Sequence, residues 1–238
     1  TDVFNKLRGP ANSIVEVQVY RKDEGRTIDY EIVRGNIPLK SIESAQMVSD
    51  KIGYIKLARF AEPTPIEFIH AAKKLKNNGM DRLILDLRGN GGGYLQPAVD
   101  LANHFFRLGK KIVYTEGRYG GRTDYMSDEK GLLHNCKVAI LIDANTASAS
   151  EIVSGAIQDN DRGIVLGRRS YGKGLVQEPI MLSDGSSIRL TVARYYTPAG
   201  RCIQKPYGEG VDYYSDVTAR YENGEFYGLD SSLLENLE

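Results

Sequence analysis

The segment Thr146-Ala147-Ser148-Ala149-Ser150-Glu151 places two serines between an apolar run and a helix-forming sequence. The apolar run at residues 138–143 is typical of a buried strand, and residues 146–159 are expected to form a helix. Helix N-termini stabilise negative charge, so a serine here could attack a carbonyl carbon beside donors for the developing oxyanion. A serine at this place also caps helices for structural reasons alone, and the spacing does not select Ser148 over Ser150.

A glycine-rich segment, Arg88-Gly89-Asn90-Gly91-Gly92-Gly93, follows another apolar run at residues 82–87. Open α/β sheets bind ligands where their strands end, and glycines let backbone N–H groups approach a substrate oxygen or a phosphate. The segment lacks the Gly-x-Gly-x-x-Gly spacing of dinucleotide-binding loops. It therefore indicates either a backbone site for an oxyanion or a tight structural turn.

Residues 167–174 read Gly-Arg-Arg-Ser-Tyr-Gly-Lys-Gly and nearly spell a phosphate-binding loop. However, Gly174 replaces the Ser or Thr that binds magnesium, and a β-prone run at 175–182 stands where that motif needs a helix. Lys173 could instead be an ordinary solvated lysine. In a third interpretation, burial near Tyr171 lowers the Lys173 pKa below the usual value of about 10.4, so that the neutral amine deprotonates a serine.

Composition argues against several other functions. Lysine plus arginine and aspartate plus glutamate number 31 each, which gives no electrostatic case for nucleic acid or an anionic membrane. No apolar run approaches the roughly 18 residues of a membrane span. The three histidines and two cysteines form no zinc or redox motif, so we expect no metal and no cofactor. Three polar residues near the serines are also considered. Asp159, 11 positions after Ser148 on the same helical face, could tune the site, but such a residue more often caps or pairs structurally. Glu151 is expected to complement the helix dipole, and His134 to be a surface or packing residue.

The elements that must position these residues alternate between strands and helices, which predicts an α/β core with parallel strands. Strands are expected at residues 52–60, 82–87, 111–115, 138–143 and 163–167, and helices at 64–79, 95–108 and 146–159. Thr64-Pro65-Ile66-Glu67 has the spacing of a capping box. Asp184-Gly185 predicts a hairpin of strands 175–182 and 187–196. Residues 36–49 read as a connection.

Taken together, these segments resemble the C-terminal processing peptidases, which are tail-specific serine proteases of the S41 family with a Ser/Lys dyad. The resemblance covers about Gly53 to Gln204. The motifs that carry it lie at residues 85–93, 146–153, 158–159, 167, 171–174, 177, 184–185 and 191–201.

The resemblance implies a role for each residue of the candidate site. Ser148 would be the nucleophile, Lys173 its base, and Gln177 the residue that orients the lysine. The oxyanion hole would consist of the Ala149 N–H and the N–H of either Gly91 or Gly92. Gly91 occupies the position where many relatives carry proline.

The resemblance also implies an architecture of two domains. Residues 35–238 would form the peptidase domain, an α/β fold with a crotonase-like ββα core of the tail-specific protease type and an appended β-hairpin. Residues 1–34, a short helix and a valine-rich hairpin, would be the C-terminal part of a PDZ-like domain. The first half of that domain, with its peptide groove, would lie before Thr1, so we expect weak binding of substrate tails.

The expected partners are protein or peptide substrates with exposed C-terminal tails, with neither nucleic acid nor an integral membrane segment. The resemblance suggests an extracytoplasmic location, periplasmic or secreted, and leaves homo-oligomerisation open. Two other functions stay open at this point. One is a nucleotide-binding protein with a P-loop-like segment, and the other is a peptide-binding module without catalysis.

Overall fold

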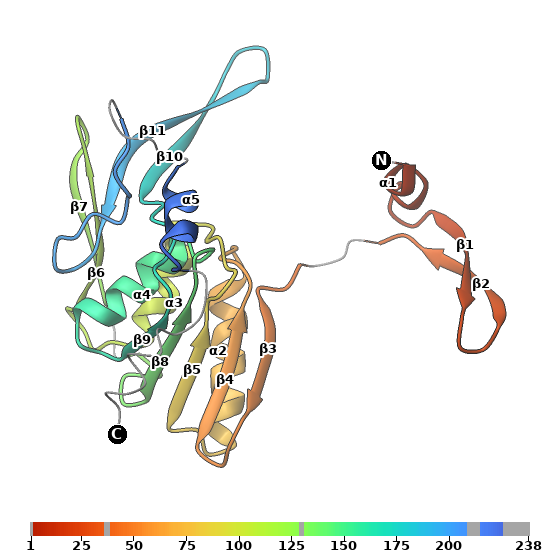
Figure 1. The fold of residues 1–238 in the computed structure, drawn as a ribbon, viewed down its shortest axis with the longest axis horizontal. Helices are drawn as coiled ribbons and strands as arrows, with labels where there is room; N and C mark the ends of the chain where they lie inside the picture. Colours follow the sequence, from red (N-terminus) through yellow and green to blue (C-terminus); the bar gives the residue numbers. More distant parts are fainter. Residues whose placement is uncertain (1, 36–38, 129–130, 209–214, 226–238) are drawn as a thin grey trace. The chain divides into compact units, whose positions relative to one another are not determined.

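The computed structural model describes residues 2–35, 39–128, 131–208 and 215–225. The chain divides into two compact units, Thr1–Leu39 and Lys40–Glu238 (Figure 1). Both candidate serines, the glycine-rich segment and Lys173 belong to the second unit. No helix in the described ranges is both long and apolar enough to cross a bilayer.

The first unit is a short helix followed by an antiparallel hairpin. Its elements are α1 (Asp2–Leu7), β1 (Ile14–Arg21) and β2 (Arg26–Val33). Arg34 joins the helix to the hairpin, because its guanidinium donates to the carbonyls of Lys6, Leu7 and Ile14. None of the described residues of this unit is buried, so the hairpin presents side chains on both faces without a core of its own.

The larger sheet of the second unit has the strand order β3-β4-β5-β8-β9. Its strands are β3 (Ile42–Met47), β4 (Ile52–Leu57), β5 (Arg82–Asp86), β8 (Lys137–Ile142) and β9 (Ile164–Gly167). Strands β4, β5, β8 and β9 are parallel to one another, and β3 pairs antiparallel with β4 at the edge of the sheet. Because the parallel strands end at a common edge, the polar segments that follow β5 and β8 come together there.

Three helices connect the parallel strands and pack against them in the core. They are α2 (Thr64–Asn77), α3 (Leu95–Asn103) and α4 (Ala149–Asp159). The helix α3 contacts both α2 and α4, and α4 also contacts β9 of the larger sheet and β6 of the second sheet. Almost all of α4 is buried, from Ala149 to Ile157, so its N-terminus is fixed firmly against the sheet edge.

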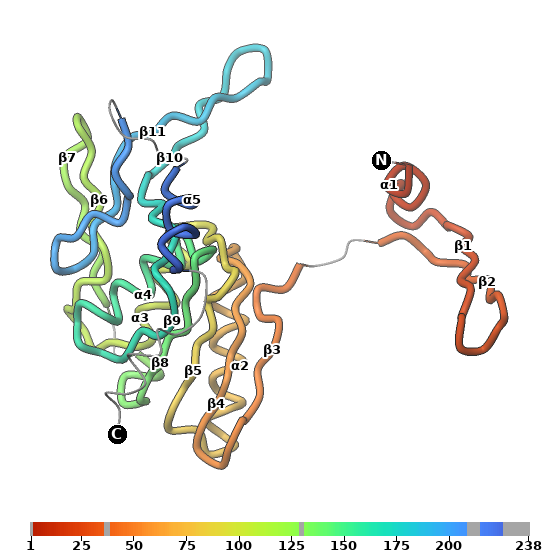
Figure 2. The backbone as a smooth tube through the Cα atoms, viewed as in Figure 1, coloured from red at the N-terminus to blue at the C-terminus, as the bar shows by residue number. Residues whose placement is uncertain are grey.

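The second sheet is antiparallel, with the order β10-β11-β6-β7. Its strands are β6 (Lys111–Gly117), β7 (Gly121–Met126), β10 (Leu175–Met181) and β11 (Ser187–Tyr196). Only Arg194 to Tyr196 of β11 pair with β6, so most of the β10–β11 hairpin extends beyond β6 and β7 (Figure 2). The predicted Asp184-Gly185 turn is present, with Gly185 at a φ of 83° and the Ser186 N–H donating to Asp184.

Some local predictions were wrong. The capping box at Thr64 does not form, because Glu67 Oε2 accepts from the N–H groups of Ser41 and Ile42 instead of its own helix end. Thr64 Oγ1 accepts from the Ala61 N–H and joins Ser41 Oγ. The segment expected to be only a connection contains β3, which gains its stability by pairing with β4. The spacing of Thr64 and Glu67 predicted a cap within one helix, whereas both side chains form hydrogen bonds to residues outside that helix.

Candidate active site

Ser148 lies at the turn between β8 and α4, directly before the first residue of the helix. Its φ is 58° and its ψ is −118°, which is a strained conformation for a residue with a Cβ. The side chain is half-buried, and the preceding Ala147 N–H donates to Asn90 O at 3.0 Å. Strained backbone of this kind concentrates at functional positions, so the conformation singles out Ser148 as a candidate nucleophile.

Ser150, the other serine of the motif, has a structural role. It is fully buried, and its hydroxyl donates to Asn90 O at 3.0 Å. This hydrogen bond joins helix α4 to the glycine-rich segment. The structure thus separates two serines that the sequence spacing could not distinguish.

The glycine-rich segment lies directly against Ser148. A Cβ atom on Gly92 would stand 2.7 Å from Ser148 Cβ and 2.8 Å from Ala149 N, so no larger residue fits there. The Gly92 N–H donates to the Asn90 side chain at 2.8 Å, and Asn90 Nδ2 donates to Leu57 O. Within the described residues, the N–H groups of Gly91 and Ala149 donate to no acceptor. The Gly92 N–H is thus engaged within the protein, whereas the Gly91 and Ala149 N–H groups have no protein acceptor among the described residues.

Lys173 follows a loop that is fastened to the start of α4. Its backbone N–H donates to Glu151 Oε2 at 2.8 Å, and the Tyr171 N–H donates to Thr146 O at 2.9 Å. The Lys173 side chain is exposed, so the expected burial was wrong. The Tyr171 ring is engaged by another side chain, since Lys205 Nζ lies 4.9 Å from its centroid.

Gln177 lies on β10 opposite Thr191, and its side chain is exposed. Among the described residues, no hydrogen bond joins Lys173 Nζ to Ser148 Oγ or to the Gln177 side chain. The structure therefore holds the backbone of the Lys173 loop beside the serine turn, while the long lysine side chain extends into solvent.

Two further residues that the sequence did not reveal hold this loop. Gln204 Oε1 accepts from the Gly174 N–H at 2.9 Å. Arg220, on helix α5 (Ser215–Glu222), is buried and donates to Arg169 O at 2.6 Å and to Ser170 O at 3.4 Å. All three contacts span 30 residues or more, so no local pattern could have indicated them.

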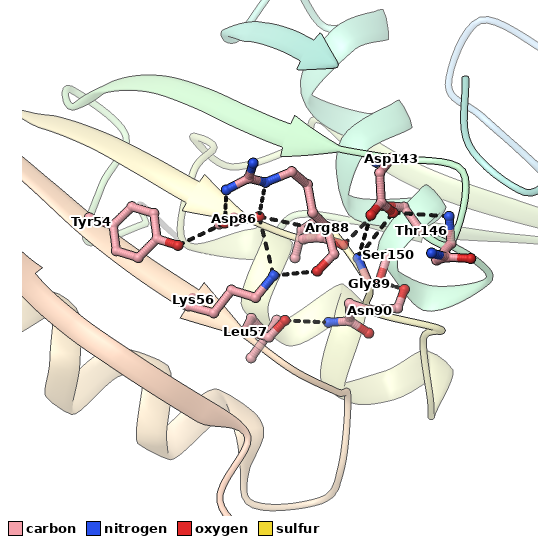
Figure 3. A network of polar contacts seen from close by, with 12 residues as sticks. Tyr54, Lys56, Leu57, Asp86, Arg88, Gly89, Asn90, Asp143, Thr146 and Ser150 are labelled. Atoms are coloured by element: carbon pink, nitrogen blue, oxygen red, sulfur yellow. Dashed lines mark hydrogen bonds and ion pairs between the residues drawn. The ribbon is translucent and has the colours of Figure 1, made fainter. Parts of the chain in front are cut away.

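A second polar cluster fixes the start of the glycine-rich segment (Figure 3). Asp86, at the end of β5, is only 1% exposed, and it accepts hydrogen bonds from the Tyr54 hydroxyl, Lys56 Nζ and the Arg88 guanidinium. Burial alone would raise the pKa of Asp86, but the hydrogen bonds from Arg88 and Tyr54 outweigh it and hold that pKa well below its usual range. Asp86 is therefore a buried carboxylate that stays charged at neutral pH.

We expect Asp86→Asn to lower the free energy of unfolding at pH 7 by about 2–3 kcal/mol, because Tyr54, Lys56 and Arg88 lose a buried, charged acceptor. The native pKa of Asp86 lies below that of the unfolded chain, which is about 3.9. Its contribution is therefore present above the unfolded pKa and disappears as the pH falls through the native pKa. Urea unfolding should show that the difference in the free energy of unfolding between the parent and Asp86→Asn is smaller in acid than at pH 7. Asp124→Asn, at an exposed pair, should change little; equal losses in the two variants would contradict this account.

Asp143, just after β8, joins the two loops of the site (Figure 3). Its carboxylate accepts from the Gly89 N–H at 3.0 Å, and from the Asn145 N–H at 2.9 Å. Thr146 Oγ1 in turn donates to Leu87 O at 2.9 Å. The glycine-rich segment and the serine turn are thereby held as one rigid unit at the carboxyl edge of the sheet.

The other polar residues weighed from the sequence lie away from Ser148. Asp159 stands at the far end of α4, roughly 16 Å along the helix, where it accepts from the Ala199 N–H and pairs with Arg201. His134 precedes β8, at the opposite end of that strand from the serine turn.

Burial raises the pKa of the Cys136 thiol, and Cys202 is exposed and unbridged. Across the described ranges, no cluster of three or more His, Cys, Asp or Glu side chains could hold a metal ion.

The fold and the site together define a class of protein. A mostly parallel α/β sheet presents a serine on a strained strand-to-helix turn, next to a glycine loop with unused N–H groups. These are the parts of a serine hydrolase site.

The comparison with known sequences places the chain within that class. Peptidase family S41 matches residues 51–214, and the chain belongs to this family. A carboxyl-terminal-processing protease of Synechocystis sp. is 35% identical over 204 residues, which is 84% of this chain and 47% of that protein. The chloroplastic carboxyl-terminal-processing peptidase 2 of Arabidopsis thaliana is 38% identical, over 86% of this chain and 41% of its own length. The chain thus spans about half the length of these relatives.

A solved structure agrees with the sequence matches. The photosystem II D1 C-terminal processing protease superimposes with a TM-score of 0.64 at 32% identity. The match covers 85% of this chain and 56% of that structure. The predicted α/β class and the predicted family are confirmed.

Proposed function

We propose that this chain carries the catalytic part of a serine endopeptidase that cleaves protein substrates near their C-terminus. The observation that supports this most is the strained Ser148, packed against Gly92 with the N–H groups of Ala149 and Gly91 unused. The relatives named as carboxyl-terminal-processing proteases point to the same activity. In this proposal Ser148 is the nucleophile, and Lys173 is the general base.

The proposed reaction has two stages. Ser148 Oγ attacks the peptide carbonyl carbon as its proton passes to neutral Lys173 Nζ, and the Ala149 and Gly91 N–H groups bind the oxyanion. The C–N bond then breaks, and Lys173 gives its proton to the leaving amine. Lys173 then takes a proton from water as the water oxygen attacks the ester carbonyl carbon. The bond between that carbon and Ser148 Oγ breaks, and Lys173 gives the proton to Ser148 Oγ. Every proton moves between these groups, so the proposed reaction uses no cofactor.

Lys173 must approach Ser148 for this reaction. Its loop is already fixed by backbone hydrogen bonds, so only the exposed side chain has to move. A peptide bound over the loop would remove the amine from water, which favours its neutral form. Gln177, four residues along β10, would then hold the lysine by its side-chain amide.

The finer architecture is also a proposal. We assign the β4–α2–β5, β5–α3–β8 and β8–α4–β9 units to a crotonase-like core, and residues 1–34 to the C-terminal part of a PDZ-like domain. Suitable substrates are proteins or peptides with exposed C-terminal tails. We place the protein outside the cytoplasm, in the periplasm or secreted.

The two alternative functions are less well supported. A phosphate-binding loop at residues 167–174 needs a helix after Lys173, but β10 begins at Leu175. A peptide-binding module without catalysis would not explain why Ser148 is held in a strained conformation beside donors with no protein acceptor.

Peptide cleavage mapped by mass spectrometry tests the proposal. The substrate is an unstructured peptide with an apolar, free C-terminus, and its matched control is the C-terminally amidated peptide. We expect cuts near the C-terminus of both peptides at similar rates, because the described residues of Thr1–Leu39 bury no side chain and offer no packed groove for a carboxylate. A clear preference for the free carboxylate would show that this chain reads the tail itself. Absence of Ser148-dependent cleavage would refute the proposed function.

A further inference from the structure

Glu151 occupies a central place between the two halves of the proposed dyad. Glu151 lies in the first turn of α4 and is 5% exposed. Oε2 accepts from the backbone N–H of Ser148 at 2.8 Å and from the backbone N–H of Lys173 at 2.8 Å. A single oxygen atom therefore binds the backbone of both the proposed nucleophile and the proposed base.

The second oxygen of Glu151 extends the same contact. Oε1 accepts from the Gly172 N–H at 2.6 Å and from the Ser170 hydroxyl at 2.6 Å. All four partners are neutral donors, and three of them belong to the loop that leads into Lys173. Such a carboxylate is stabilised by converging N–H and O–H groups and by the positive end of the helix, rather than by a cation.

These contacts do more than complement the helix dipole. The first turn of α4 fixes Glu151, because the rest of the helix is buried in the core. The loop at residues 170–173 has no regular secondary structure, so its position relative to Ser148 depends on such cross-links. An error of about 1 Å between reacting groups can lower a rate by about 10²-fold.

We propose that Glu151 is a positioning residue that sets the distance between the Ser148 turn and the Lys173 loop, an inference that rests on the proposed function. It transfers no proton and touches no substrate. Its carboxylate acts as a template on which the backbone of both residues is assembled.

Glu151→Gln tests this directly, because the amide keeps the shape and loses one acceptor oxygen. In either orientation its NH₂ group faces two donors, so either the Ser148 and Lys173 N–H groups or the Ser170 and Gly172 donors lose their acceptor. We expect kcat for peptide cleavage to fall by about 10- to 100-fold, with KM changed less than about threefold. Glu151→Asp, which keeps the carboxylate but is one methylene shorter, should have an intermediate kcat.

Asp159→Asn is the matched control, since Asp159 is a buried carboxylate on the same helix with contacts at its other end. This variant is expected to lower the thermal midpoint and to keep the parent's kcat per folded molecule. The inference is overturned if Glu151→Gln keeps the parent's kcat, or if Asp159→Asn loses as much.

A second measurement separates this inference from the proposed function. Amide hydrogen exchange of Ser148, Gly172 and Lys173 should be slow in the parent and faster in Glu151→Gln, while the middle of α4 is unchanged. If the parent cleaves no peptide but the exchange changes as stated, the proposed function fails and the positioning role of Glu151 stands. Unchanged exchange at all three amides overturns the positioning role whatever the activity.

Discussion

Ser148→Ala is expected to lower kcat for peptide cleavage by about 10³-fold or more, because the bond to the carbonyl carbon can no longer form. The thermal midpoint should stay nearly unchanged, since alanine carries the same Cβ as serine at a φ of 58°. Steady-state cleavage of a fluorogenic peptide, together with thermal unfolding of both proteins, measures the two effects.

Ser150→Ala is the matched control for that experiment. Ser150 donates to Asn90 O, so its loss should lower the free energy of unfolding by about 1 kcal/mol and leave most of the activity. If Ser150→Ala is the inactive protein and Ser148→Ala cleaves normally, the assignment of the nucleophile is wrong.

Lys173→Arg is expected to lower kcat by about 10²- to 10⁴-fold, because a guanidinium stays charged and cannot accept the serine proton. The fold should be unaffected, since the Lys173 side chain is exposed and only its backbone N–H is bonded to Glu151. Cleavage rates and circular dichroism of the parent and the variant provide the measurement.

An exposed lysine elsewhere provides the control for this substitution. Lys137 begins β8, at the end of that strand opposite the serine turn, so Lys137→Arg should retain the parent's rate. Substantial activity in Lys173→Arg, or magnesium-dependent ATP binding by the parent, would favour the nucleotide-binding alternative.

Much of the site scaffold could be predicted from the sequence, because it depends on local patterns. Apolar runs at residues 82–87 and 138–143 predicted parallel strands, and the glycine run between Arg88 and Gly93 predicted a loop at the sheet edge. The structure places that loop against Ser148, as the short contacts of Gly92 show. Strand periodicity and glycine content carry this information directly.

The remaining features depend on contacts between distant residues. Glu67 looked like a helix-terminal carboxylate, yet it binds the backbone at the start of β3. Glu151 does lie in the first turn of its helix and accepts from the Ser148 N–H, but it also binds a loop about 20 residues away. Lys173 is exposed, and the Tyr171 ring that was expected to help bury it is engaged by Lys205. The donors that a carboxylate binds are those that the tertiary fold brings near it. Residue spacing within one segment does not determine which donors these are.

The most direct test of the central claim is to locate the acyl group of a trapped acyl-enzyme. The parent chain is mixed with a peptide thioester, quenched in acid and digested, and the acylated peptide is sequenced by mass spectrometry. We predict an ester on Ser148 in the parent and none in Ser148→Ala. An acyl group on Ser150, or cleavage by the parent with no acylated serine at any time point, would contradict it.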